Sequence, residues 1–277
     1  MIVLGTHVYP ARGDAAVRMQ RALDSWTSLP DVRLVNLQFA GDPAPPAHPG
    51  FDTAAVLHHD SRTVARVEGP RKPIVREMLD CLVERAETAG ASYAGFSNAD
   101  IIITPAAIER VARGRHDAVI FSRMGIDAST GAGQGEFVSG QDTLFVRPAA
   151  YRRVRARLRP YIVGEMPWDV IYTSVMLSHL RAELVNRGDE CRHVDHDAIW
   201  VDSPFAAYRW RLAHMDWTYF ARWYRYYHGV LEIRARGGTL AEEEAWRDVV
   251  FGRLTLRERA ANVYRRVRYG GFRGDST

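Results

Sequence analysis

The first 121 residues alternate between short apolar segments and longer segments with the periodicity of an amphipathic helix. No other feature of the sequence constrains the fold as strongly. Apolar runs bounded by turn residues indicate buried strands, and apolar residues at intervals of three and four indicate helices. Strands that alternate with helices are typical of an α/β fold, in which helices cover both faces of a mostly parallel sheet. The strands are expected at 2–4, 32–39, 93–96 and 118–121, and the helices at 15–29, from 73 and from 105.

Two segments interrupt this alternation and are expected to be loops. Residues 41–50 contain four prolines, which remove backbone donors and break regular structure. Residues 125–140 are rich in Gly, Ser and Thr. The glycines Gly131, Gly133 and Gly135 do not form a dinucleotide-binding fingerprint, because that motif follows a first strand and precedes a helix. The sequence therefore argues against a nicotinamide-binding protein.

The length of 277 residues allows one large domain, or one domain with an appendage. We expect a first unit at 1–205 and a helical extension at 206–277. The sequence has no apolar run of the ~20 residues that span a bilayer, no basic leader before its first apolar residues, and no cysteines at metal-binding spacing. These features predict a cytoplasmic protein.

The net charge of +4 comes almost entirely from arginine, since Lys72 is the only lysine in the chain. A basic chain suits anionic partners such as phosphates, nucleic acid or acidic lipid, without choosing among them. Lysine and arginine are not equivalent at a binding site. Lys72 is therefore a candidate ligand contact. The alternative is that this single lysine occurs by chance in a chain that otherwise uses arginine.

The extension after Pro204 is rich in aromatic residues, which occupy seven of the eleven positions from 217 to 227. One stripe follows helical spacing and is expected to pack against the rest of the chain. The remaining aromatics could pack there too, or meet a membrane interface or a saccharide. The packing stripe consists of Ala213, Trp217, Phe220, Tyr224, Tyr227 and Leu231, and the remaining aromatics are Tyr219, Trp223 and Tyr226.

The last segment, 251–277, holds seven arginines and predicts a basic helix followed by a frayed end. The alternatives are a solvated surface helix, a peripheral contact with an anionic membrane, and a contact with a protein partner. Nucleic acid is not expected as a partner, because the sequence carries no signature of a recognition module.

The junction from Gly95 to Pro105 carries the strongest candidate site residue. Small and polar residues lead there to Asp100, an apolar run follows at once, and Thr104 and Pro105 provide the cap and the first position of a helix. An acid at such a junction lies at the rim of a sheet, where it can hold a metal or contact a sugar. A turn-stabilising aspartate is the alternative.

Three further polar blocks follow this junction along the chain. The first is a loop that feeds a short buried strand, and the second places a proline and two acids at a helix start. The third is a dense group of histidines and aspartates before an expected strand. They cover residues 139–148, 163–170 and 193–200.

In this order, the junction and the three blocks resemble the glycosyltransferases of the GT-A fold, over about residues 1–205. The closest likeness is to bacterial glycosyltransferase-like proteins with an Asn-x-Asp-Ile junction and a Trp-Asp helix start. The resemblance implies a GT-A-like, Rossmann-type mixed sheet, mostly parallel and flanked by helices, with a helical C-terminal extension. It also implies transfer of a sugar from a nucleotide-sugar donor to a saccharide or lipid-linked acceptor, in the synthesis of a surface polysaccharide or a related glycan.

In that fold the junction usually carries an Asp-x-Asp motif, whose acids hold a divalent metal against the donor diphosphate or contact the ribose and sugar. Here Asn98 stands in place of the first acid, and Asp100 corresponds to the last. The resemblance implies donor contacts from Thr6, Asn98 and Asp100. It also implies a Mn²⁺ or Mg²⁺ site made by Asp100 with His193 or His196. Because Asn98 carries no charge, a metal-independent site is an alternative, and so is a polar strand edge for the histidines.

Without a metal, positive side chains would have to neutralise the leaving diphosphate. The candidates for this donor contact are Lys72, Arg71 and Arg76. Lys72 directly precedes an expected helix, whose free backbone N–H groups would add affinity for an anion. A solvated basic turn is the alternative.

Asp169 is the candidate general base by the same likeness, and Glu165 is the second choice. A base that takes the proton of an acceptor hydroxyl typically contributes about 10²–10⁴-fold in rate. The positive end of the helix is expected to lower the pKa of Asp169 and keep it ionised, and an ordinary first-turn acid is the alternative. Asp142 is expected to bind sugar hydroxyls, and Trp168 either stacks on a sugar or closes the core.

Two other functions compete with sugar transfer. A sugar nucleotidyltransferase also combines an α/β sheet with phosphates and metal-binding acids, but the segment after the first strand has no glycine-rich activation loop. A non-catalytic binding or scaffold protein on a decayed transferase fold is favoured by Asn98 in place of an acid.

Overall fold

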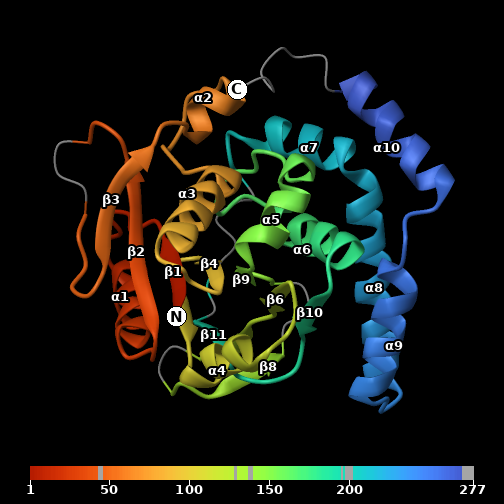
Figure 1. Ribbon diagram of the computed structural model, residues 1–277, viewed down its shortest axis with the longest axis horizontal. Coiled ribbons are helices and arrows are strands. Elements are labelled where there is room, and N and C mark those ends of the chain that lie inside the picture. Colours follow the sequence, from red (N-terminus) through yellow and green to blue (C-terminus); the bar gives the residue numbers. More distant parts are fainter. Residues whose placement is uncertain (43–45, 128–129, 137–139, 195, 197–201, 270–277) are drawn as a thin grey trace.

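The computed structural model describes residues 1–42, 46–127, 130–136, 140–194, 196 and 202–269 (Figure 1). Its main sheet has the strand order β10-β6-β9-β4-β1-β2-β3. Strand β9 runs antiparallel to both its neighbours, and the other pairs are parallel. This confirms the expected mixed, mostly parallel sheet. The strands are β1 (Ile2–Thr6), β2 (Val32–Phe39), β3 (Asp52–Leu57), β4 (Tyr93–Ser97), β6 (Ala118–Phe121), β9 (Thr143–Val146) and β10 (Ala182–Val185).

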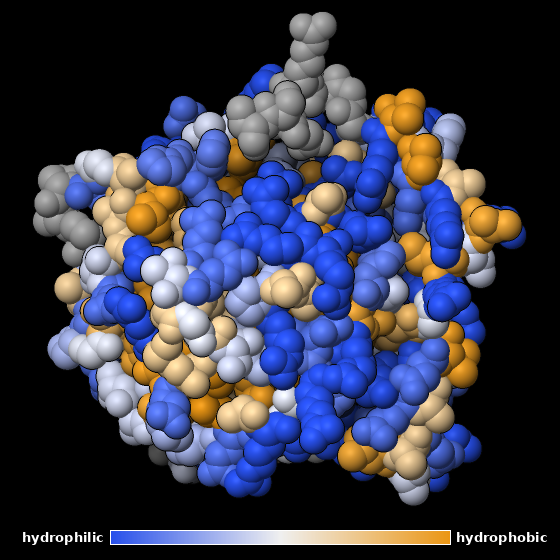
Figure 2. All heavy atoms as spheres, viewed as in Figure 1, coloured by the Kyte–Doolittle hydropathy of each residue, from blue (hydrophilic) through white to orange (hydrophobic). Residues whose placement is uncertain are grey.

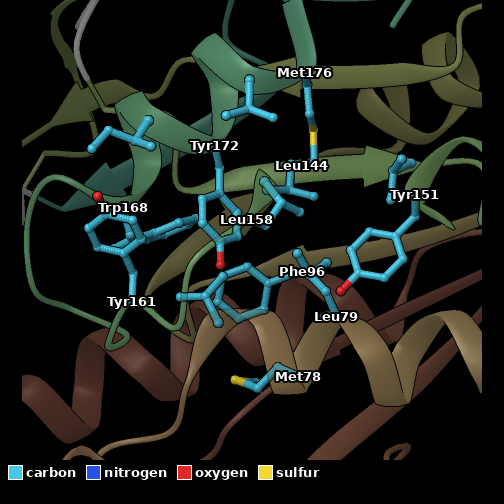
Figure 3. Close-up of a cluster of buried hydrophobic side chains, with 14 of the residues drawn as sticks. Met78, Leu79, Phe96, Leu144, Tyr151, Leu158, Tyr161, Trp168, Tyr172 and Met176 are labelled. Carbon is cyan, nitrogen blue, oxygen red and sulfur yellow. The ribbon is translucent and has the colours of Figure 1, made fainter. Parts of the chain in front are cut away.

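Helices cover both faces of this sheet, because successive strand residues point to opposite sides. On one face, Leu4 packs in a cluster with side chains of α1 and α4. On the other, Val3 belongs to a larger cluster with side chains of α3, α5 and α6 (Figure 3). These helices and two shorter ones are α1 (Asp14–Thr27), α2 (Ser61–Ala65), α3 (Val75–Thr88), α4 (Pro105–Arg113), α5 (Pro148–Val154), η1 (Arg155–Arg157) and α6 (Trp168–His179).

A second, smaller sheet has the order β5-β11-β7-β8. One of its strands falls within 125–140 and another overlaps the start of that segment, which was expected to be a loop, so that prediction was wrong there. Glycine weakens a strand locally, but β8 is held by backbone pairing with β7, which composition does not reveal. The four strands are β5 (Ile101–Ile103), β7 (Met124–Ile126), β8 (Gly133–Glu136) and β11 (Cys191–Val194).

Between residues 206 and 269 the structure describes four helices, and Figure 1 shows them along one side of the molecule. Side chains of α7 and α8 belong to the same hydrophobic cluster as those of α6, so the extension packs directly on the sheet-bearing part. No helix among the described residues is both long and apolar enough to cross a membrane. The helices are α7 (Ala206–Met215), α8 (Trp217–Ala235), α9 (Leu240–Phe251) and α10 (Leu256–Tyr269).

The face of α8 that packs inward only partly follows the expected stripe, of which Phe220 and Tyr227 pack against the core. Trp217 and Tyr224, members of the predicted packing stripe, are 40% and 59% exposed. Tyr219, Trp223 and Tyr226 are instead buried in the core. Both stripes carry large aromatic side chains, so periodicity alone could not distinguish the inner face from the outer one.

This arrangement predicts a large difference between two neighbouring aromatics. Trp223→Ala removes a buried ring and should lower the free energy of unfolding by about 3–5 kcal/mol, whereas Tyr224→Ala should change it by less than about 0.5 kcal/mol. Urea unfolding followed by circular dichroism measures both. Equal effects, or the reverse order, would contradict the described orientation of α8.

Candidate functional site

Polar residues gather where the parallel strands of the main sheet end, which is the edge at which open α/β sheets bind ligands. Thr6 is the last residue of β1 and is buried. Asp100 lies shortly after β4, and Arg123 shortly after β6. Asp142 reaches the same edge because β9, which it precedes, is antiparallel.

Asp100 lies close to both histidines that the resemblance implied as its partners. The Oδ2 atom of Asp100 is 3.5 Å from Nε2 of His193 and 3.6 Å from Nε2 of His196. Strand pairing explains the approach, because His193 of β11 stands opposite Ile101, the residue after Asp100. Burial opposes ionisation of Asp100, but the two imidazoles hold the pKa of its carboxyl below the usual range.

These three residues could hold a divalent metal, since one ligand atom from each lies within 4.8 Å of the others. Ligands at about 2.0–2.2 Å from a shared ion are separated by distances of this order. Imidazole nitrogens suit transition metals such as Zn²⁺, Fe²⁺ and Ni²⁺, and a carboxylate suits Mn²⁺ and Mg²⁺. The three residues can therefore hold a divalent metal, as the resemblance implied, without selecting between Mn²⁺ and Mg²⁺. The predicted strand after His196 lies outside the described residues.

Asp142 is held by two partners at this edge. Its Oδ1 accepts a hydrogen bond of 2.9 Å from Nδ2 of Asn98, and its Oδ2 forms an ion pair with Arg123. The pairing of Ser97 with Thr143 brings Asn98 and Asp142 side by side. The Oδ1 atom of Asn98 is buried and has no hydrogen-bond partner among the described residues.

Asp169 lies in the first turn of α6 and is half-buried. Burial and the charge of Asp142 raise its pKa to about 7, against the lowering effect of backbone N–H groups and Arg123. The expected lowering by the helix end is therefore outweighed, and that prediction was wrong in direction. A carboxyl with a pKa near neutrality is well matched to general base catalysis.

Two residues of this edge carry no local sequence signal and were missed. Arg123 is close enough to Asp142, Asp100 and Asp169 for all three carboxylates to raise its pKa, although burial lowers it. Tyr9 follows β1, and burial and the charge of Asp100 raise its pKa. The only sequence signal for a role at this edge was position, since Tyr9 follows the first predicted strand and Arg123 follows the fourth.

Trp168 lies in the core, so of its two expected roles the structure supports the closing of the core. Its side chain is only 2% exposed. Its ring meets Phe96 edge-on at 5.4 Å and Tyr172 at 6.0 Å, as Figure 3 shows. Because these contacts use the ring, Trp168 offers no free face to a sugar.

Glu165 and Lys72 are brought together in an ion pair. Oε1 of Glu165 accepts hydrogen bonds of 2.7 Å from Nζ of Lys72 and from Oγ of Ser203. Its Oε2 accepts one of 3.2 Å from Arg209. With its side chain 1% exposed and both oxygens engaged, Glu165 is poorly placed to take a proton from an acceptor. Its hydrogen bonds instead hold the loop before α6 in place.

The two arginines predicted to contact the donor lie in different places. Arg71 stacks over Phe39 at the end of β2, 4.0 Å from the ring centroid, and pairs with Asp60 and Asp42. It therefore stands near the ligand-binding edge. Arg76 donates a hydrogen bond of 3.3 Å to the carbonyl of Leu158, a residue of the buried cluster in Figure 3.

Thr104 is the N-cap of α4, and Pro105 occupies the first turn as expected. The Thr104 hydroxyl makes no capping hydrogen bond, so that part of the prediction was wrong. Its backbone N–H instead donates to the carbonyl of Glu190, which ties the helix start to the small sheet.

No protein-family model matches this sequence, and no curated protein matches it. Solved structures similar to it include S. aureus TarS 1–349, at 10% identity and a TM-score of 0.47, over 96% of this chain and 72% of that one. A glycosyltransferase involved in glycosylation of the major capsid of PBCV-1 aligns with 71% of this chain and 95% of its own, at 9% identity and a TM-score of 0.39.

A third similar structure is the galactosyltransferase LgtC in complex with donor and acceptor sugar analogs. It aligns with 78% of this chain and 95% of its own, at 10% identity and a TM-score of 0.36. The function of the present chain has to be inferred from the residues of its own site.

Proposed function

We propose that this protein is a glycosyltransferase, which moves a sugar from a nucleotide-sugar donor to a saccharide or lipid-linked acceptor. One observation carries the proposal. Around Arg123 lie a carboxylate with two histidines, a hydrogen-bonded aspartate, and a carboxyl whose pKa is raised to about 7. Sugar transfer needs an anion-binding group for the leaving diphosphate and a base for the acceptor hydroxyl, and this edge offers both.

The donor diphosphate is assigned to Asp100, His193 and His196, through Mn²⁺. When bound, the metal would neutralise the charge that develops on the leaving diphosphate. Arg123 is oriented by Asp142 and adds positive charge to the same region. Thr6, Asn98 and Arg71 are the remaining donor contacts, with the Oδ1 of Asn98 accepting a hydroxyl of the ribose or the sugar.

The acceptor hydroxyl is assigned to Asp169. Its carboxylate takes the hydroxyl proton as the acceptor oxygen forms a bond to the anomeric carbon. The bond from that carbon to the phosphate oxygen breaks, and the nucleoside diphosphate leaves. Asp142 is assigned to a sugar hydroxyl. Glu165 and Lys72 are positioning residues, whose ion pair of 2.7 Å fixes the loop that leads to Asp169.

We further propose that the product belongs to a surface polysaccharide or a related glycan. The resemblance of the polar blocks to the GT-A glycosyltransferases supports this. The segment after β1 has no glycine-rich activation loop, which argues against a nucleotidyltransferase. The same edge would serve a nucleotidyltransferase less well, because that reaction needs no base beside a saccharide hydroxyl.

A donor screen tests the proposal. UDP, GDP, CDP and dTDP sugars are titrated by calorimetry with and without Mn²⁺, and donor hydrolysis is followed by chromatography. We expect one nucleotide to bind selectively, more tightly with Mn²⁺, with slow hydrolysis when acceptor is absent. Binding of none of them by the folded protein would favour the scaffold function. Formation of a nucleoside triphosphate from a nucleotide sugar and pyrophosphate would favour the nucleotidyltransferase.

A further inference from the structure

A second feature of the molecule lies away from the ligand-binding edge, where α6, α8 and α10 meet. They enclose a cavity of about 540 Å³. Its wall includes Arg157, Arg253, Arg259 and Arg266, together with His179. Four arginines around one cavity produce a positive potential that the fold itself does not require.

The charge of this cavity is only partly offset by the described residues, because the buried Asp216 interacts with Arg266 from a distance. Arg157 and Arg259 donate to the backbone carbonyls of Arg153 and Leu254, each at 3.2 Å. None of the four cavity arginines forms an ion pair with a carboxylate in the described part of the chain. Burial, and then the charges of Arg157, Arg222 and Arg259, lower the pKa of His179 to about 4. The cavity thus resists a further positive charge and favours an anion.

The outer face of α10 beside this cavity is apolar. Leu256, Val263, Tyr264 and Val267 are 83%, 62%, 58% and 77% exposed, and their spacing places them on one side of the helix. We call these four residues the α10 ridge. Figure 2 shows hydrophobic side chains protruding at the end of the molecule that α10 forms, beside strongly hydrophilic ones.

Arginines border the α10 ridge on both sides. On a helical projection, Arg259 and Arg266 follow one margin of the ridge, and Arg257 and Arg268 follow the other. An apolar face between basic margins is typical of helices that lie in a membrane interface, with the apolar side chains at the boundary between headgroups and acyl chains. Arginine stems also bury their methylenes there while their charges reach phosphates.

We propose that the α10 ridge and the arginine cavity dock this protein on a membrane surface rich in anionic phospholipid. The ridge enters the interface, and headgroup phosphates are received by the cavity arginines. A lipid surface accounts for both features, because Arg259, Val263 and Arg266 line the cavity and also form the ridge or its margin. A soluble anion would use the cavity alone and leave the ridge in water. The inference does not depend on the proposed transfer reaction.

Vesicle binding tests the proposal with the full chain. Co-sedimentation with phosphatidylcholine vesicles is compared with that of vesicles that also contain phosphatidylglycerol. We expect binding to the anionic vesicles alone, weakened by salt. Each arginine near an anionic surface contributes about fivefold in affinity, so the double variant with Arg259→Ala and Arg266→Ala should bind roughly 25-fold more weakly.

Two further variants separate the contributions. Val263→Ser with Val267→Ser keeps every charge, and should weaken binding because both side chains leave the interface. Arg113→Ala with Arg115→Ala removes the same charge from exposed positions at the end of α4, and should leave binding unchanged. Thermal unfolding confirms that each variant is folded.

The remaining outcomes would overturn the proposal. These are equal binding to neutral and anionic vesicles, an equal loss in the α4 control, or no loss in the α10 variants. Calorimetric titration with pyrophosphate tests whether the cavity binds a soluble anion instead. Saturable pyrophosphate binding that needs Arg259 and Arg266, without vesicle binding, would assign the cavity to a soluble anion.

Discussion

Asp100→Ala is expected to reduce the affinity for Mn²⁺ by at least about 100-fold and to abolish donor binding with it. Loss of a group that merely orients a metal ligand already costs about 10–100-fold in affinity, so loss of a direct ligand should cost no less. Asp100 is also the shared partner of both imidazoles, and it supplies the negative charge of the cluster. Titration calorimetry with Mn²⁺ alone, and then with the nucleotide sugar, measures the two losses separately.

Asp248→Ala is the matched control, because Asp248 is 72% exposed and its ion pair is with the adjacent Arg247. It should leave both affinities unchanged. His193→Ala and His196→Ala should each reproduce part of the loss. Unchanged Mn²⁺ affinity in Asp100→Ala, with donor binding unaffected by a chelator, would contradict the metal site. The neutralising charge would then have to come from Arg123 and Arg71.

The sequence predicted those parts of the fold whose signal is local. Residues 32–39 were expected to be a strand and form β2, and 118–121 likewise form β6, because each is a mainly apolar run between turn residues. β8 was missed, since Gly133 and Gly135 give it little strand preference and its pairing with β7 holds it in place. The inner face of α8 was only partly predicted, because the burial of each aromatic side chain depends on where α6 lies.

The residues of the candidate site also differ in whether local sequence signals could predict them. Asp100, His193 and His196 were proposed from the order of the polar blocks, and the pairing of β5 with β11 brings them together. The ion pairs of Glu165 could not be predicted from the sequence, because its partners Lys72 and Arg209 are 93 and 44 residues away. Arg123 was missed for the opposite reason, since one arginine after a strand is unremarkable until Asp142 is placed beside it.

Asp169→Asn is expected to lower the rate of sugar transfer by about 10²–10⁴-fold, the usual contribution of a general base, while the donor still binds. The amide has the size of the carboxylate but cannot accept the acceptor proton. Single-turnover transfer measures the rate, and calorimetry measures donor affinity. Asp14→Asn is the matched control, because Asp14 is also an acid in the first turn of a helix, and it should leave transfer unchanged. Loss of donor affinity in Asp169→Asn equal to the loss of rate would instead assign Asp169 to donor binding.

The pH dependence gives this prediction a second, independent readout. Because burial and Asp142 raise the pKa of Asp169 to about 7, its basic form accumulates only as the pH rises through that value, and kcat/KM of the wild type should rise with it. The stability of the protein should change in the opposite direction. The folded state binds the proton more tightly than the unfolded state, whose pKa is about 3.9, so the free energy of unfolding falls as the pH rises between the two values. Asp169→Asn should remove both effects and become more stable than the wild type above pH ~7. A rate profile that keeps its rise near neutrality in Asp169→Asn would place the base on another residue.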